Sequence, residues 1–380
     1  INIEEGPKYF YRNFIFDGNQ IAEEDELKRL LGIQSGDMFS KEQFDKSVYE
    51  NMMSTYQDKG YIFSSVTPEV TPAGKDSLDV KFVFNEGNKV YVENIFVSGN
   101  EKTRENVIRR ELKLYPGDVF SRSKLMRSQR DIWILNYFDN VIPDVTPISD
   151  DKVNLDFVVE EKKSTQRINA NLGFTGEYGI TGGAGVEFDN FRGKGQKLNI
   201  GASTGTNFSI YTTQEPSKYR SLNISFQDPM INDSPYLVGA SIFYSFRGSS
   251  TNYYFPLDFT VGGAVASFGR RLEWPDDFFR VMWSAKFMQK EYEGSQSDID
   301  NYIGGLQKTR GISLSQVLSR DSRNRAEFPT NGSTFILENT YSGGFLGGNE
   351  NFQKHMLTLD WFTPTFSKFV LYNSVKLGVI

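Results

Sequence analysis

Apolar and polar residues alternate from Gln166 to Ile210, in three successive stretches. In the first stretch, the even-numbered residues from Ile168 to Phe174 are apolar and the odd-numbered ones are polar or small. A period of two places alternate side chains on opposite faces of a β-sheet. The polar face consists of Asn, Ser, Thr and Gly with occasional charged residues, which favours a transmembrane β-barrel with a water-filled lumen. The alternative is a water-soluble β-sandwich, whose apolar face turns to a core.

The same alternation continues to Ile380 and predicts about eleven strands. The turns between them alternate between short and long, except that residues 321–332 form a long connection on the short-turn side. Short inner turns and long outer loops are typical of outer-membrane barrels, which have even strand numbers in bacteria. We therefore interpret residues 164–380 as the N-terminal part of a larger antiparallel all-β barrel, and the chain as a processed or excised piece. The later strands are predicted at residues 219–227, 237–247, 259–271, 279–292, 311–320, 333–341, 352–363 and 369–380.

An internal repeat with a spacing of 81 residues occupies the first 163 positions. Gly18-Asn19 reappears as Gly99-Asn100, and Gly36-Asp37 reappears as Gly117-Asp118. Two separate pairs at one spacing are hard to produce by chance, so we predict two copies of one structural unit.

Each copy predicts a strand, two helices and two further strands, with Ser40 or Ser121 as N-cap of the second helix. The result is an α+β domain of the β-α-α-β-β type, with helices on one face of a three-stranded sheet. We place these domains at residues 8–87 and 88–163. Residues 1–7 are interpreted as the last strand of an upstream copy, because their Glu-Gly pair recurs 81 residues later.

The overall composition excludes several classes of partner and of structure. A formal net charge of −6 argues against nucleic acid, since phosphate binding needs a concentrated basic surface. The mean hydropathy of −0.45 fits a barrel, because averaging hides a lipid face made of every second residue. No run approaches the roughly 20 apolar residues of a spanning helix. The absence of cysteine excludes disulfides and cysteine metal sites.

We find no catalytic constellation in the sequence and expect neither an enzyme nor a metal or cofactor. His355 is the sole histidine and lies in a predicted strand, where a structural role is favoured. The acidic clusters 23–26, 160–161 and 276–277 fall at a helix start, a linker and a turn, where solvated carboxylates are usual. The glycine-rich residues 182–185 lack the lysine and the helix of a phosphate loop, so we expect close packing or bending there.

Three features together resemble the BamA family of outer membrane protein assembly factors, in the POTRA-barrel superfamily. The tandem β-α-α-β-β units resemble POTRA domains, and residues 190–195 (NFRGKG) resemble the family's turn after the second barrel strand. Residues 227–229 and 328–332 resemble later periplasmic turns, while the family's V-R-G-F loop is absent because the chain ends before its expected place. The turn residues are Asn190, Phe191, Gly193, Gly195, Asp228, Pro229, Phe328, Pro329 and Gly332.

A three-stranded sheet leaves an edge that can pair with an extended peptide. If the units are POTRA folds, this edge is the strand after the second helix. An edge capped by side chains is the alternative, and Pro143 blunts part of the second one. The predicted edge residues are Tyr61, Ile62, Phe63, Ser64, Ser65 and Val66 in the first copy, and Phe138, Val141, Ile142 and Val145 in the second.

The first barrel strand is the sharper candidate for substrate pairing. This strand must pair with the last strand to close the barrel. Its polar positions Asn169, Asn171 and Gly173 carry no bulky side chains that would pack across this seam, and glycine weakens a strand. The residues alone leave a closed seam as the simpler interpretation, whereas the resemblance implies a lateral gate at which a substrate strand pairs. The gate residues are Gln166, Arg167, Ile168, Asn169, Ala170, Asn171, Leu172 and Gly173.

The resemblance thus implies the central subunit of an assembly machinery that folds and inserts outer-membrane proteins. It implies a Gram-negative outer membrane, with POTRA domains in the periplasm. The implied partners are unfolded outer-membrane proteins, accessory lipoproteins and the lipid bilayer. A polypeptide export pore of the two-partner secretion type and a passive porin are the alternatives.

Overall fold

The computed structural model describes residues 7–175, 179–206, 218–249, 255–325, 328–366 and 368–380. It divides into two compact units, which we call the repeat unit (Ile1–Asn100 and Ile108–Glu161) and the sheet unit (Glu101–Val107 and Lys162–Ile380). Residues 1–6 of the predicted upstream strand lie outside the described residues, as do Phe208 and Ile210 of the third alternating stretch.

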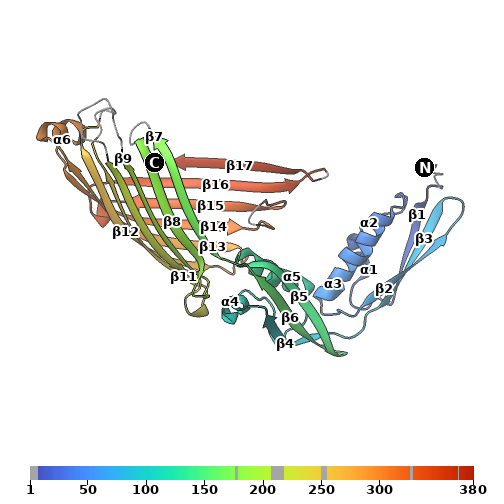
Figure 1. Cartoon of the computed structure of the whole chain (residues 1–380). Helices are drawn as coiled ribbons and strands as arrows, with labels where there is room; N and C mark the ends of the chain where they lie inside the picture. Colours follow the sequence, from blue (N-terminus) through green and yellow to red (C-terminus); the bar gives the residue numbers. More distant parts are fainter. Residues whose placement is uncertain (1–6, 176–178, 207–217, 250–254, 326–327, 367) are drawn as a thin grey trace. The chain divides into compact units, whose positions relative to one another are not determined.

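The first repeat has the predicted β-α-α-β-β order (Figure 1). Its three strands pair in the order β1-β3-β2, with β1 parallel and β2 antiparallel to the central strand. The Ser40 hydroxyl accepts a hydrogen bond from the Gln43 N–H and caps the second helical segment as predicted. The elements are β1 (Phe10–Asp17), α1 (Glu24–Leu31), α2 (Lys41–Asp45), the π-helical η1 (Lys46–Met52), α3 (Met53–Asp58), β2 (Ser65–Pro72) and β3 (Ser77–Asn85).

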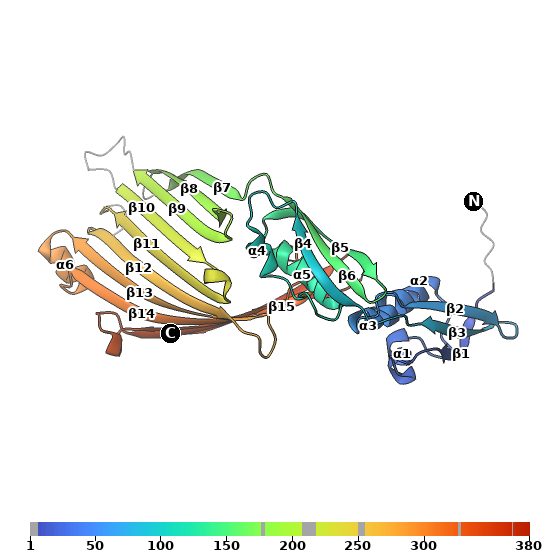
Figure 2. The same ribbon diagram turned by 90° about the horizontal axis from the view of Figure 1, so that it is seen from below.

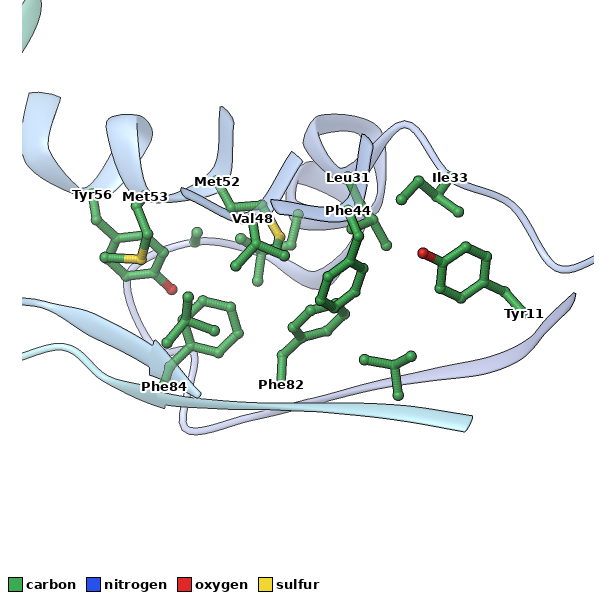
Figure 3. Packing of buried hydrophobic residues seen from close by; sticks show 14 residues of the cluster. Tyr11, Leu31, Ile33, Phe44, Val48, Met52, Met53, Tyr56, Phe82 and Phe84 are labelled. Carbon is green, nitrogen blue, oxygen red and sulfur yellow. The ribbon is translucent and has the colours of Figure 1, made fainter. Parts of the chain in front are cut away.

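A core of aromatic and aliphatic side chains joins the helices of this repeat to its sheet. Phe82 on β3 is fully buried, with ring centroids 5.9 Å from Phe44 and 5.2 Å from Phe16. Tyr56 and Met52 point from the helices toward the same strand (Figure 3). Burying each such side chain stabilises the fold by about 1.5–3 kcal/mol. The alternation along β3, where every second residue is buried, places this core on one face of the sheet.

The second repeat has the same topology, in the strand order β4-β6-β5. Its first helix is short, and its second helix begins at the predicted N-cap Ser121, whose hydroxyl accepts a hydrogen bond from the Lys124 N–H. The elements are β4 (Tyr91–Ser98), α4 (Glu105–Arg109), α5 (Arg122–Ile134), β5 (Phe138–Ser149) and β6 (Lys152–Glu161).

The two repeats meet where α3 of the first contacts the N-terminus of α5 in the second. The Asp58 carboxylate accepts hydrogen bonds from the Ser123 N–H at 2.6 Å and from the Ser121 hydroxyl at 3.1 Å. A carboxylate at a helix N-terminus satisfies unpaired N–H groups and interacts favourably with the helix dipole. Asp58 therefore acts as a capping residue supplied by the neighbouring repeat.

The sheet unit is built on one antiparallel sheet of eleven strands that pair in chain order (Figure 2). This confirms the predicted number of strands. They are β7 (Gln166–Thr175), β8 (Gly179–Phe191), β9 (Gln196–Thr206), β10 (Lys218–Asp228), β11 (Tyr236–Arg247), β12 (Asp258–Arg271), β13 (Phe279–Glu293), β14 (Lys308–Asp321), β15 (Gly332–Ser342), β16 (Phe352–Pro364) and β17 (Val370–Val379). The short helices are η2 (Ile231–Asp233), α6 (Gln296–Ile303) and η4 (Gly344–Leu346).

Within the described part of the chain, no helix is long and apolar enough to cross a membrane.

The register of the strands gives this sheet one apolar and one polar face. Residues that pair directly across strands lie on the same face. Ile224 pairs with Ile200 on one side and with Ile242 on the other, so isoleucines line up on the apolar face. One position along, Ser225 pairs with Asn199 and Ser241 on the polar face.

Candidate strand-pairing site

β7 forms one edge of the sheet and contains all eight predicted gate residues. It pairs with β8, and no other described strand pairs with it. Because no described strand pairs with β7 on its other side, its apolar side chains are largely exposed: 78% for Ile168, 83% for Leu172 and 79% for Phe174. An exposed strand edge with apolar side chains is a ready template for another strand.

The hydrogen bonds at the start of β7 determine which backbone groups face the open side. The Asp189 N–H on β8 donates to the Thr165 carbonyl, so the odd-numbered positions of β7 point their backbone groups toward β8. Gln166 instead donates its N–H to the Ser164 hydroxyl, which in turn donates to the Gln166 carbonyl. It follows that Ile168, Ala170, Leu172 and Phe174 direct their N–H and C=O groups away from β8.

Ion pairs join β7 to β8 at the start of the strand. Arg167 forms ion pairs at 3.0 Å with both Glu187 and Asp189 on the polar face of β8. Further along, β7 lies opposite glycines. A Cβ atom at Gly183 would come within 2.6 Å of the Asn171 side-chain oxygen, so the Asn171 side chain of β7 occupies the space over this glycine. The predicted close packing at residues 182–185 therefore applies to Gly183.

Our sequence reasoning missed the ion pairs of Arg167. The signal was present, because Glu187 and Asp189 occupy polar positions of the strand that forms a hairpin with β7. A register for that hairpin would have placed the three charged residues on one face.

The free edges of the two repeats are β2 and β5, as the topology predicts. The predicted range of the first edge strand was wrong, because β2 begins at Ser65. Tyr61 continues the turn that ends the preceding helix, its N–H donating to the Tyr56 carbonyl, and the Ser64 N–H donates to the Tyr61 carbonyl. Tyr61, Ile62, Phe63 and Ser64 therefore lie outside the edge strand, while Phe138, Val141, Ile142 and Val145 all lie in β5.

Prolines reduce the number of free backbone N–H groups on both of these edges, and there are more prolines than the single Pro143 that we considered from the sequence. β2 contains Pro68 and Pro72, and β5 contains Pro143 and Pro147. Proline has no N–H, so within a sheet it occupies positions whose backbone faces away from the neighbouring strand. Outward-facing positions are two residues apart along a strand. Two prolines four residues apart therefore remove every second outward-facing backbone N–H group in that part of each edge. β7 contains no proline, so none of its outward N–H groups is removed in this way.

The outer side of the first strand in each repeat is partly covered. The Tyr11 N–H donates to the Asp37 carbonyl, and the Gly36 N–H donates to the Tyr11 carbonyl. The second repeat has the same two bonds, between Val92 and the turn at Gly117-Asp118. The repeated Gly-Asp pair is thus the turn that covers β1 and β4, which leaves β2 and β5 open.

Charged pairs add to the polarity of β1 and its neighbour. Lys81 lies 2.8 Å from Asp17, and its hydrogen bond lowers the pKa of the Asp17 carboxyl below its ordinary value. Arg12 likewise hydrogen-bonds Asp79 and lowers the pKa of that carboxyl. Charges along an edge oppose pairing with an apolar strand.

The predicted turn residues have structural roles within the sheet unit. The Asn190 side chain accepts from the Gly195 N–H at 2.7 Å and donates to the Thr103 hydroxyl at 2.8 Å. Gly193 has a φ of +68°, and a Cβ there would clash with the Lys102 carbonyl. The Asp228 carboxylate accepts from the Gln196 side chain and from the Met230 N–H. These turns therefore fix the ends of β8 to β10.

Comparisons with known proteins identify the class. Residues 190–380 match the family model described as the Omp85 superfamily domain. Residues 9–87 and 90–162 match the POTRA model, described as surface antigen variable number repeat. The chain therefore belongs to the Omp85 superfamily, with two POTRA repeats before its sheet.

Individual relatives of similar sequence are named as outer membrane protein assembly factors. The chain is 27% identical over 395 residues to the outer membrane protein assembly factor BamA of Nitratidesulfovibrio vulgaris, an alignment that includes all of this chain and 46% of that protein. It is 31% identical over 208 residues to BamA of Neisseria meningitidis serogroup B, covering 53% of this chain and 26% of that protein. The chain thus spans less than half of the length of these relatives. The resemblance to the BamA family is confirmed.

Solved structures share the fold. BamA from Haemophilus ducreyi lacking POTRA domains 1–3 matches with a TM-score of 0.67 at 19% identity, over 98% of this chain and 70% of that one. CdiB from Escherichia coli matches with a TM-score of 0.51 at 11% identity, over 98% and 68%. The predicted fold class, POTRA repeats followed by an antiparallel barrel sheet, is confirmed.

Proposed function

We propose that this chain is part of an outer membrane protein assembly factor, which folds and inserts other β-barrels into the outer membrane of a Gram-negative bacterium. In this proposal the POTRA repeats lie in the periplasm, and the apolar face of the sheet contacts lipid. The free edge of β7 is the template for the first strand of an incoming barrel. The observation that carries the proposal is the row of outward-facing backbone groups from Ile168 to Phe174 on a strand without proline.

Strand pairing and burial are sufficient to drive such a reaction. Each backbone hydrogen bond between β7 and a substrate strand contributes about 0.5–1.5 kcal/mol net, and more in a site that excludes water. The apolar side chains of the substrate strand would continue the apolar face that Ile168 and Leu172 begin. The proposal therefore includes no chemical step and no cofactor.

The POTRA edges have a different part in this proposal. Since prolines remove alternate donors from β2 and β5, these edges would hold an extended chain weakly and release it. Weak pairing suits guidance of an unfolded outer-membrane protein toward the sheet. Accessory lipoproteins that dock on the POTRA repeats are further partners in the proposal.

The second candidate is a polypeptide export pore of the two-partner secretion type. It is favoured by the fold shared with CdiB from Escherichia coli, at 11% identity. An export pore moves one polypeptide through its lumen, and that function does not require a substrate strand to pair with β7. A passive porin, the third alternative, has no use for POTRA repeats.

Depletion of the full-length protein, followed by quantification of outer-membrane proteins, tests the proposal. The proposal predicts a broad loss of β-barrel proteins from the outer membrane within a few generations. Loss of a single secreted protein with normal levels of other barrels would overturn the proposal and support an export pore.

A further inference from the structure

A row of polar side chains interrupts the apolar face of the sheet on β14, β15 and β16. Gln316, Asn339 and His355 pair directly across these strands and so lie on one face. The Asn339 side-chain nitrogen donates to the Gln316 side-chain oxygen at 3.4 Å, and its oxygen lies 2.9 Å from His355 Nδ1. We call these three residues the polar row. On β14 the next residues on the same face are Leu314 and Leu318.

The polar row begins near the end of the sheet where β15 turns into β16. Asn339 is three residues from the end of β15, and His355 is three residues from the start of β16. At about 3.3 Å per residue this is roughly 10 Å along the strands. Gln316 is eight residues from the start of β14, between two leucines of the apolar face. Asn339 and His355 therefore lie near this end of the sheet, while Gln316 lies further from the end of its own strand, within the apolar face.

A shallow pocket of about 210 Å³ lies over the polar row. Leu314 and Trp283 form its apolar part, while Tyr341 and Gln353 extend its polar part toward the rim. None of the described residues that line it is Lys, Arg, Asp or Glu. Such a lining offers amide, imidazole and hydroxyl groups, which hydrogen-bond neutral carbonyl and hydroxyl groups. It lacks the cationic side chains that recognise phosphate.

We propose that the polar row binds one membrane lipid through the carbonyl groups that link its acyl chains to the headgroup. One acyl chain then lies along Leu314 and Trp283. This inference rests on the proposed membrane location of the sheet. The hydrogen bonds described within the polar row do not use the Gln316 side-chain nitrogen, and a lipid carbonyl can accept from it. Polar groups that face lipid are costly unless they find such partners. Three polar residues are too few for a protein interface, which typically has about 20–30 residues a side.

Native mass spectrometry of the full-length protein tests the inference. The probes are diacyl phosphatidylethanolamine and its diether analogue, which lacks the two carbonyl groups. We expect the wild-type protein to retain the diacyl lipid at least about threefold more than the diether lipid. The variant Gln316→Leu/Asn339→Leu/His355→Leu should retain both lipids at the diether level.

The matched control is Ser203→Ala/Ser221→Ala, whose hydroxyl groups hydrogen-bond each other on the polar face of β9 and β10, away from the residues that line the pocket. It should keep the wild-type preference for the diacyl lipid. Equal retention of both lipids by the wild type, or an unchanged preference in the triple variant, would overturn the inference. If the triple variant does not fold, Asn339→Leu alone serves, since Asn339 contacts both other residues.

The lipid-binding experiment and the depletion experiment can fail independently of each other. Loss of lipid preference concerns only the polar row, whereas the depletion experiment reports on assembly. A protein that assembles barrels but shows no lipid preference would overturn the inference and leave the proposed function intact.

Discussion

The role of β7 as a template can be tested by removing one outward N–H. Ala170 lies in the middle of β7, where its backbone faces away from β8. The variant Ala170→Pro removes that donor but leaves the hydrogen bonds between β7 and β8 in place. Its neighbour Asn171 points its backbone toward β8, so Asn171→Pro removes a bond within the existing sheet instead. The two variants differ by one position and by the direction of the lost donor.

The size of the effect follows from one hydrogen bond. A net loss of about 1 kcal/mol corresponds to about a fivefold weaker pairing between β7 and an incoming strand. The proline ring also projects from the edge, so fivefold is a lower limit. Ala170→Val keeps the N–H and favours the strand conformation, and it should assemble substrates at the wild-type rate.

The assay is the folding of an unfolded β-barrel substrate by the full-length protein in liposomes, followed by heat-modifiable gel mobility. We expect Ala170→Pro to slow folding at least about fivefold, while the variant itself migrates as a folded protein. A folded Ala170→Pro protein that works at the rate of Ala170→Val would refute the assignment of the edge.

Three further predictions concern the POTRA repeats. Asp58→Ala removes the cap of α5 and should cost about 1–2 kcal/mol, seen as faster hydrogen exchange in the first turn of α5 but not in α1. Phe82→Ala removes a fully buried ring and should cost about 3–5 kcal/mol, enough to make the first repeat the first site of proteolysis. Burial and a hydrogen bond to Glu86 raise the pKa of Tyr56, so its contribution is present below the unfolded pKa of about 10 and is lost as pH rises further. Tyr56→Phe should therefore lower stability in urea by about 1–2 kcal/mol at pH 8 and by less at pH 11; an equal loss at both values would contradict this.

Most helices and strands could be predicted from the sequence, because their signals come from residues that are neighbours in the chain. Alternation with a period of two predicted eleven strands, and their observed bounds differ from the prediction by a few residues. Ser40 and Ser121 are N-caps because a serine before a helical pattern satisfies free N–H groups at the start of a helix. Such signals depend on neighbours in the chain and need no tertiary contact.

Contacts between distant residues could not be predicted in the same way. The first edge strand begins four residues later than expected, because Tyr61 and Ser64 extend the turn after the helix. The polar row depends on the register of three strands, since Gln316 and His355 are 39 positions apart in the sequence. Asp58 likewise caps a helix of another repeat, 63 or more residues away.

The central claim is that the sheet spans a lipid bilayer, with its apolar face toward lipid and its polar face toward water. The chain contains no cysteine, so single cysteines can be introduced along β10, from Lys218 to Asp228, and spin-labelled in the full-length protein in bilayers. We predict that accessibility to oxygen peaks at Leu222, Ile224 and Phe226, whereas accessibility to a water-soluble nickel chelate peaks at the residues between them. Exclusion of both reagents from the apolar positions would place that face in a protein core and contradict the account.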